Sequence, residues 1–194
     1  MENKTNKHNQ SNRVAGDIEI SSNESFTIDA RKSGGINVDG NLKVNSQKDL
    51  TIIGDGESSE NIDMNIKKIL KDKDAFELYE SNKKHKPTVI YTKEKYKAET
   101  SEFEMKKSTL VSEGEIIIDA ANIDLRDSII AAGEAIYFKG LEGVECDNTY
   151  IGSKKIYLDK HESATDLLVT GVIGGCKIEG ALEIVANQFN HDEL

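Results

Sequence analysis

Three aspartates, Asp119, Asp124 and Asp127, are the closest grouping of side chains that could act as acids and bases. Carboxyl groups held near one another can divide the general acid and general base roles between them. The chain, however, has 35 acidic against 25 basic residues and a formal net charge of −10. In such a chain, outward-facing carboxylates keep strands solvated and protect their edges. We therefore predict no catalytic residue and no enzyme activity.

Residue types that bind metals are scattered along the chain. The four histidines show no ligand spacing to one another or to a cysteine; they are His8, His85, His161 and His191. The sequence therefore predicts no metal and no cofactor. The two cysteines, Cys146 and Cys176, are too few for a disulfide framework. We expect each to be a free, half-buried thiol, with a single bridge between them as the alternative.

Composition argues against several partners and locations. Nucleic acids and anionic membrane surfaces select basic faces, which disfavours both for an acidic chain. No apolar stretch is long enough to span a membrane, and the polar residues 1–16 lack the apolar centre of a secretory signal. We therefore expect a stand-alone product of this sequence to be cytoplasmic. The C-terminal HDEL matches a retention signal read only inside the endoplasmic reticulum, so we expect that match to be coincidental.

Apolar positions recur at an interval close to twenty residues. Ile116, Ile136 and Ile156 each open a short run of apolar β-forming residues. The sequence GDIEISSNESFTIDA of 16–30 also aligns without gaps on GNLKVNSQKDLTIIG of 40–54. Within these runs apolar and polar residues alternate, which is the period of a strand with one buried face.

Short alternating strands at a fixed interval predict a solenoid. We predict an all-β fold, a parallel β-helix (β-solenoid) with coils of about 20–24 residues and one charged insertion. A β-sandwich or barrel with accidental self-similarity is the alternative. Like residues would stack in ladders, with small residues such as Ala131, Gly152 and Gly174 at the corners. The two predicted ladders are Ile116, Ile136, Ile156 and Ile178, and Leu110, Ile130, Ile151 and Ile173.

Residues 67–107 interrupt the repeats with 12 lysines and 8 acidic residues. The part through Tyr79 predicts a short helix, and the part after Pro87 predicts a hairpin or an added strand. A charged insertion on a solenoid is most often a solvated excursion, but insertions also collect on the binding faces of repeat proteins. The candidate contact for an acidic partner is the basic cluster of Lys83, Lys84, His85 and Lys86.

These patterns divide the chain into five parts. The predicted parts are a disordered or capping tail over 1–13, N-terminal coils over 14–66, the insertion over 67–107, C-terminal coils over 108–187, and a polar tail over 188–194.

The stretch 108–140 resembles the haemagglutinin repeats of filamentous haemagglutinins and contact-dependent inhibition exoproteins. In that pattern a serine opens each repeat, followed by alternating apolar residues, a small-residue and glycine turn, and an Asn- or Asp-led strand. Ser108, Glu113–Gly114 and Asn122–Leu125 occupy those places, and Ser128 with Ala132–Glu134 begins the next repeat. Single glycines of the pattern are replaced by glutamate in both repeats. The resemblance is clearest over about 60 residues and extends over about 150.

The resemblance implies that the β-helix is right-handed and is a segment of a bacterial surface or secreted exoprotein. Such a segment would act in adhesion or cell contact, with a protein or cell-surface partner. One alternative is an intracellular, self-assembling scaffold, because the glycine-punctuated C-terminal coils are similar to those of bactofilin-like proteins. End-to-end homo-association would then build a filament. A trimeric phage or secretion-system spike and a non-functional gene remnant are further alternatives.

Overall fold

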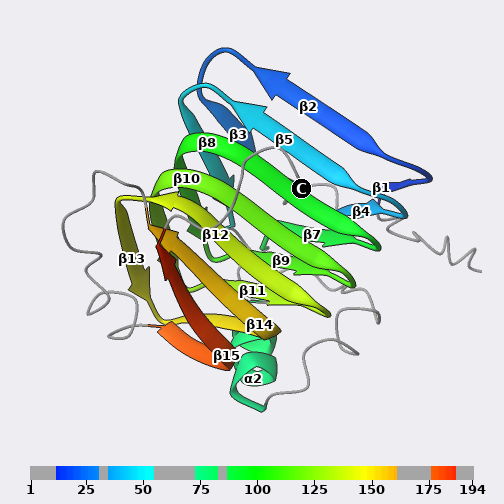
Figure 1. The fold of residues 1–194 in the computed structure, drawn as a ribbon. Coiled ribbons are helices and arrows are strands. Elements are labelled where there is room, and N and C mark those ends of the chain that lie inside the picture. Colours follow the sequence, from blue (N-terminus) through cyan, green and yellow to red (C-terminus); the bar gives the residue numbers. More distant parts are fainter. Residues whose placement is uncertain (1–11, 31–34, 55–72, 83–86, 161–175, 187–194) are drawn as a thin grey trace, which may run out of the picture.

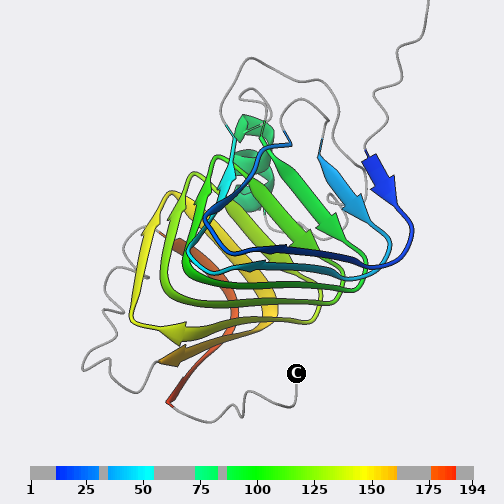
Figure 2. The ribbon, with the colours of Figure 1, turned by 90° about the horizontal axis from the view of Figure 1, so that it is seen from above.

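The computed structural model describes residues 12–30, 35–54, 73–82, 87–160 and 176–186 (Figure 1). Its strands form one sheet that winds into a solenoid, and all strand pairs among the described residues are parallel. Viewed from above, the coils superpose in a three-sided outline (Figure 2). The prediction of an all-β parallel β-helix is confirmed, whereas an immunoglobulin-like sandwich or an up-and-down barrel would need antiparallel neighbours.

The strands form three faces that the chain visits in the same order in each coil. Face 1 contains β1 (Asn12–Val14), β4 (Ile36–Val38), β7 (Val89–Thr92), β9 (Thr109–Ser112), β11 (Ile129–Ala132) and the first parts of β14 (Thr149–Lys160) and β15 (Cys176–Ala186). Face 2 contains β2 (Ile18–Ser22), β5 (Leu42–Ser46), the first parts of β8 (Lys95–Lys106) and β10 (Glu115–Arg126), then β12 (Ala135–Leu141) and the second parts of β14 and β15. Face 3 contains β3 (Phe26–Ile28), β6 (Asp49–Ile53), the second parts of β8 and β10, and β13 (Gly143–Asp147).

The core is a set of apolar ladders that run through the middle of the coils. Ile116 pairs with Ile136 and Ile136 with Ile156, as predicted, and all three are fully buried. The other predicted ladder is confirmed at Leu110, Ile130 and Ile151, and the gapless alignment of 16–30 on 40–54 is the observed register. Apolar burial of this kind stabilises by roughly 25 cal/mol per Å² removed from water.

The last coil has a different register from the prediction. Ile156 pairs with Leu182, and Ile151 pairs with Ile178, whereas Ile173 lies outside the described residues. The predicted positions of Ile178 and Ile173 in the ladders were therefore wrong. The segment between β14 and β15 is longer than the connections between the strands from β7 to β14. A short match between degenerate strand motifs cannot fix the register across it, because the additional residues can all lie in the connection.

The corner between faces 3 and 1 uses the same backbone conformation in successive coils. Lys107, Asp127 and Asn148 have φ values of 45°, 47° and 42°, and each is followed by a buried hydroxyl residue. A left-handed residue turns the chain sharply, and aspartate and asparagine adopt that conformation more readily than most residues. The Asn148 amide also donates to the Asp127 carboxylate over 2.7 Å.

The buried hydroxyls that follow these residues link each coil to its neighbour. Ser128 Oγ donates to the Arg126 carbonyl (2.8 Å) and accepts from the Ser108 N–H of the preceding coil (3.3 Å). Thr149 Oγ1 repeats the arrangement, accepting from the Ser128 N–H over 3.2 Å. The serine that opens each sequence repeat is therefore a structural group, because it satisfies buried backbone polar groups in two coils.

The insertion leaves and re-enters the solenoid at this same corner. Thr88 Oγ1 donates to the Ile53 carbonyl, as Ser108 does to the carbonyl of Lys106 one coil later (2.9 Å). A Cβ placed on Gly54 would lie 2.8 Å from the Pro87 Cα, so the two ends of the excursion are adjacent. The segment between them can therefore vary in length without disturbing the stacked coils.

Two parts of the range 67–107 have defined roles in the fold. Strands β7 and β8 form a regular coil with parallel neighbours on both sides, so this part is neither a hairpin nor an excursion. Helix α2 (Lys73–Asn82) covers the outer side of face 1. Its Tyr79 is fully buried in a cluster with Val89, Tyr91, Val111, Ile129, Ala131 and Tyr150. This part of the charged segment is therefore packed, because its tyrosine shields an apolar outer face from water.

Glycines are required where one coil's corner touches the next. A Cβ on Gly133 would lie 2.1 Å from the Glu113 carbonyl oxygen, and one on Gly114 would lie equally close to the Glu94 carbonyl. The predicted corner glycine Gly152 instead lies inside β14, where a Cβ would strike the Tyr150 ring. A glycine is needed in one case because a carbonyl of the neighbouring coil lies close, and in the other because a tyrosine ring lies close. The spacing of glycines in the sequence did not distinguish these two cases, since both recur at about the interval of one coil.

Replacing Ser128 with alanine is expected to lower the free energy of unfolding by about 2 kcal/mol, because the Ser108 N–H loses its buried acceptor. Urea denaturation measures the change. Ser101→Ala is the matched control, since Ser101 is exposed and its loss is expected to cost less than about 0.5 kcal/mol. Equal stability of the two variants would show that the hydroxyl ladder does not hold the coils.

Replacing Gly133 with alanine is expected to destabilise by about 1–3 kcal/mol, because the new methyl group meets a backbone carbonyl that cannot move independently. Gly143→Ala is its control. The atom nearest to a Cβ there is the Asn122 Oδ1, a side-chain atom at 3.1 Å. Thermal unfolding of both variants tests the expectation, and a Gly133→Ala protein that melts with or above the control would contradict it.

Candidate functional site

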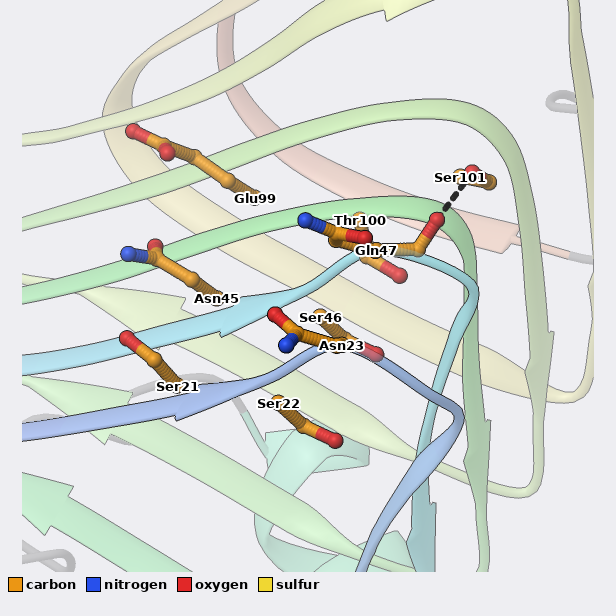
Figure 3. Close-up of a pocket in the computed structure, with 9 residues that line it drawn as sticks. All are labelled: Ser21, Ser22, Asn23, Asn45, Ser46, Gln47, Glu99, Thr100 and Ser101. Atoms are coloured by element: carbon orange, nitrogen blue, oxygen red, sulfur yellow. Dashed lines mark hydrogen bonds between the residues drawn. The ribbon is translucent and has the colours of Figure 1, made fainter.

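A hollow on the described surface lies at the corner between faces 2 and 3 of the first three coils (Figure 3). Its volume is about 400 Å³, within the range of small-ligand sites. It is lined by Ser21, Ser22, Asn23, Asn45, Ser46, Gln47, Glu99, Thr100 and Ser101. These residues come from equivalent positions, since Ser21 pairs with Asn45 and Asn45 with Glu99. We call this hollow the polar corner groove.

Most hydroxyls of the polar corner groove already bind the backbone. Ser46 Oγ donates a hydrogen bond to the Glu24 carbonyl (2.8 Å). Thr100 Oγ1 donates to the Lys48 carbonyl (2.7 Å), and Ser101 Oγ donates to the Gln47 carbonyl (3.2 Å, dashed in Figure 3). These bonds stabilise the bend, as serine and threonine side chains do in many turns. They leave the hydroxyls little capacity for a ligand.

The groove also contains two exposed amides and one partly exposed carboxylate. Asn23 and Gln47 are exposed, and their amides can both donate and accept. Lys97 Nζ lies 2.8 Å from Glu99 Oε1, and this hydrogen bond is the main reason why the pKa of Glu99 is lowered. The groove therefore presents amides beside a carboxylate that is ionised at neutral pH. That set suits hydrogen bonding to a polar ligand and supplies no activated nucleophile.

A second hollow of about 500 Å³ lies at the corner between faces 1 and 2 and is rich in acids. Its lining residues are Asn41, Lys93, Glu94, Lys95, Glu113, Gly114, Glu115 and Glu134. Lys95 pairs with Glu115 (3.1 Å), and the Tyr91 hydroxyl donates to Glu113. Within the described ranges, no three histidine, cysteine or acidic side chains are placed to hold a metal ion.

The three aspartates that are close in sequence are not brought together. Asp119 is on the outer side of face 2, where its charge acts on Lys139. Asp124 on face 3 binds Arg126 through two hydrogen bonds of 2.8 and 2.7 Å, and Asp127 is in the left-handed corner. They occupy different sides of the solenoid because strand alternation and the bend separate neighbours.

The other predicted candidates lie outside the described residues. These are the basic cluster Lys83, Lys84, His85 and Lys86, and the histidines His8, His161 and His191. In contrast, the polar corner groove was not predicted from the sequence. The gapless alignment contained its signal, since Ser21–Asn23 falls on Asn45–Gln47.

Cys146 is disulfide-bonded, so the expectation of a free thiol there was wrong. Its position explains the difference. Cys146 is in β13 beside Leu125, and the backbone of the chain's other cysteine pairs with Thr149, just after β13 ends. The shifted register of the last coil, which the sequence did not predict, brings the two cysteine positions into the same part of the solenoid.

Comparison with known proteins found no family model, no curated protein and no solved structure that matches this chain. Among the described residues, no helix has the length and apolarity required to cross a bilayer.

Replacing Lys97 with methionine is expected to raise the pKa of Glu99, because its principal hydrogen-bond donor is lost. A lowered pKa in the folded state means that the pair stabilises the fold above the carboxyl's ordinary pKa. This stability fades as pH falls through the lowered value. NMR titration of the Glu99 side-chain carbonyl measures the shift. Lys48→Met, which removes the partner of Glu24 instead, is the control and should leave Glu99 unchanged.

Proposed function

We propose that this protein is a non-enzymatic structural and adhesive β-solenoid segment of a bacterial haemagglutinin-like exoprotein that acts in cell contact at the surface or after secretion. The observation that carries the proposal is the role of the repeat-opening residues. Ser108, Ser128 and the equivalent Thr149 all serve the stacking of coils. The residues that open the haemagglutinin-like repeats thus hold successive coils together, which is what a repeat must do to extend a rigid rod.

Binding in this proposal occurs through shape and through ladders of outward side chains. On face 2 the rings of Tyr137 and Tyr157 stack with centroids 4.8 Å apart, and Lys139 beside them lies among Asp119 and Asp159. Repetition at the strand spacing presents like groups in a row, which favours a partner that is itself extended. The net charge of −10 makes a protein or cell-surface partner more suitable than nucleic acid.

The disulfide at Cys146 supports the proposed location. Disulfides persist in oxidising compartments and are rare in the cytosol, where thiols are kept reduced. A bond at Cys146 is therefore easier to reconcile with an exported protein than with a cytosolic one.

An intracellular scaffold remains the second candidate, and one observation favours it. Strands β1, β2 and β3 of the first coil each pair on one side only in the described part of the chain. An open coil edge can add a strand from another molecule, which is how solenoids assemble end to end.

Fractionation of source cells is expected to place the protein in the envelope or the medium. The probe is an antibody raised against residues 67–107, and alkylation of thiols before lysis should leave Cys146 unmodified because it is oxidised. Purified protein should then bind cells. A variant with Lys83, Lys84 and Lys86 changed to glutamate tests whether the basic cluster makes the contact. A cytosolic band near 21.4 kDa with reduced cysteines would contradict the adhesive proposal and favour the scaffold.

A further inference from the structure

Among the described residues, none covers the outer side of the first coil. In Figure 1, β2 forms the end of the stack of labelled strands, with β5 on one side of it. Val14 is 38% exposed, and Ile18, Ile20 and Phe26 are only partly buried. One coil further in, Leu42, Val44 and Leu50 are at most 1% exposed at the positions that pair with Ile18, Ile20 and Phe26. In the described part of the chain, this end therefore has room for a further layer of backbone and apolar side chains.

The strands of this coil are arranged symmetrically about Ile20. Strand β2 runs over Ile18–Ser22, with Ile20 at its centre, and β1 (Asn12–Val14) and β3 (Phe26–Ile28) lie at equal sequence distances on either side. A second copy turned about a two-fold axis through Ile20 therefore places β2 on β2 and β1 on β3, all antiparallel. Such isologous contacts are the commonest way for identical chains to pair.

We propose that this end is the interface of a head-to-head homodimer, in which the first coils of two copies pack on each other around Ile20. The inference concerns the end of the solenoid and does not depend on the location of the protein in the cell.

Backbone hydrogen bonding fits this two-fold pairing. The Ile18 N–H donates to the Asn41 carbonyl, and the Ser22 carbonyl accepts from Gln47, so alternate residues from Ile18 to Ser22 bond toward the second coil. The groups of Glu19 and Ser21 consequently point to the open side. In the proposed dimer Glu19 lies opposite the second copy's Ser21, which gives two hydrogen-bonded pairs. Ile20 meets its own copy in the closer, non-hydrogen-bonded type of pair.

The side chains are complementary in the same arrangement. Val14, the exposed large apolar residue among those described, lies opposite the second copy's Phe26. No two like charges face each other, because the charged residues meet polar or small ones. The pairs are Arg13 with Thr27, Asp17 with Asn23, Glu19 with Ser21, and Glu24 with Gly16.

A head-to-tail stack is less favourable at the same edge. The face 2 ladder that begins at Glu19 runs through Lys43 and Tyr157 to Glu183 in the last coil. Continuing the register into another copy would place Glu183 next to that copy's Glu19. Like charges at directly opposite positions destabilise a sheet, so the two-fold contact is the better match.

Cross-linking of the full chain tests the dimer directly. Ile20→Cys places one thiol on each side of the two-fold axis, at the Cα separation of about 4.5 Å that a disulfide accepts. Mild oxidation should give a covalent dimer near twice 21.4 kDa on a non-reducing gel. Glu24→Cys is the control: the Glu24 side chain is 72% exposed but faces the second copy's Gly16 in the dimer, so this variant should form no cross-link and should run near 21.4 kDa on the same gel.

Analytical ultracentrifugation provides a second measurement that needs no cysteine. The unmodified chain should sediment as a dimer, and Val14→Glu should weaken dimerisation at least tenfold while leaving the circular dichroism unchanged, because Val14 is exposed in the single chain. Three results would overturn the proposal. The first is an unmodified chain that stays monomeric at all concentrations, and the second is a chain that assembles into filaments while the Ile20→Cys variant gives no cross-linked dimer. The third is a dimer that forms only after residues 1–11 are removed, because those residues would then be the occupant of this end.

Discussion

A hydroxyl group buried at the corner between faces 3 and 1 is the contact on which the solenoid depends. The left-handed residue before it, such as Asp127, turns the chain, and the hydroxyl of Ser128 then bonds its own coil and the previous one. Since each such group joins two coils, the coils cannot slide past one another. A slip of one residue would leave buried backbone groups unsatisfied and would turn each apolar ladder toward water.

At this corner Gly54 and Pro87 are adjacent, so the chain can leave the solenoid after one coil and re-enter it at the next. Thr88 reproduces the serine contact by donating to the Ile53 carbonyl after the insertion. The helix that the insertion carries then covers face 1 with Tyr79, so that the outer side of this face is apolar and buried. Faces 2 and 3 instead carry charged pairs such as Lys97–Glu99 and Arg126–Asp124. One face is thus shielded by the chain itself, and the other two present polar ladders to possible partners.

The two ends of the solenoid also differ. Toward the C-terminus, Cys146 is covalently tied and the last coil follows a longer connection. At the other end, the strands of the first coil each pair on one side only within the described ranges, and apolar residues such as Phe26 are only partly buried. Edges of this kind are normally covered, because an open parallel edge is a template for further strands. The proposed adhesive role uses the sides of the rod, and the proposed dimer uses this end, so both can operate in the same molecule.

The sequence by itself determined the coil, since apolar residues at a twenty-residue interval, with alternation within each run, predict stacked parallel strands. It therefore predicted the ladder through Ile116 and Ile136 and the register of the first two coils. Tertiary structure decided what depends on the path between strands. The connection before β15 moved Ile178 from one ladder to the other, and Cys146 is bonded where the sequence favoured a free thiol and gave a bridge only as the alternative. The turn at each corner dispersed Asp119, Asp124 and Asp127, while stacking gathered Asn23, Asn45 and Glu99 into one groove. Local alternation is encoded residue by residue, whereas the meeting of distant residues depends on where the corners fall and on how many residues each connection absorbs.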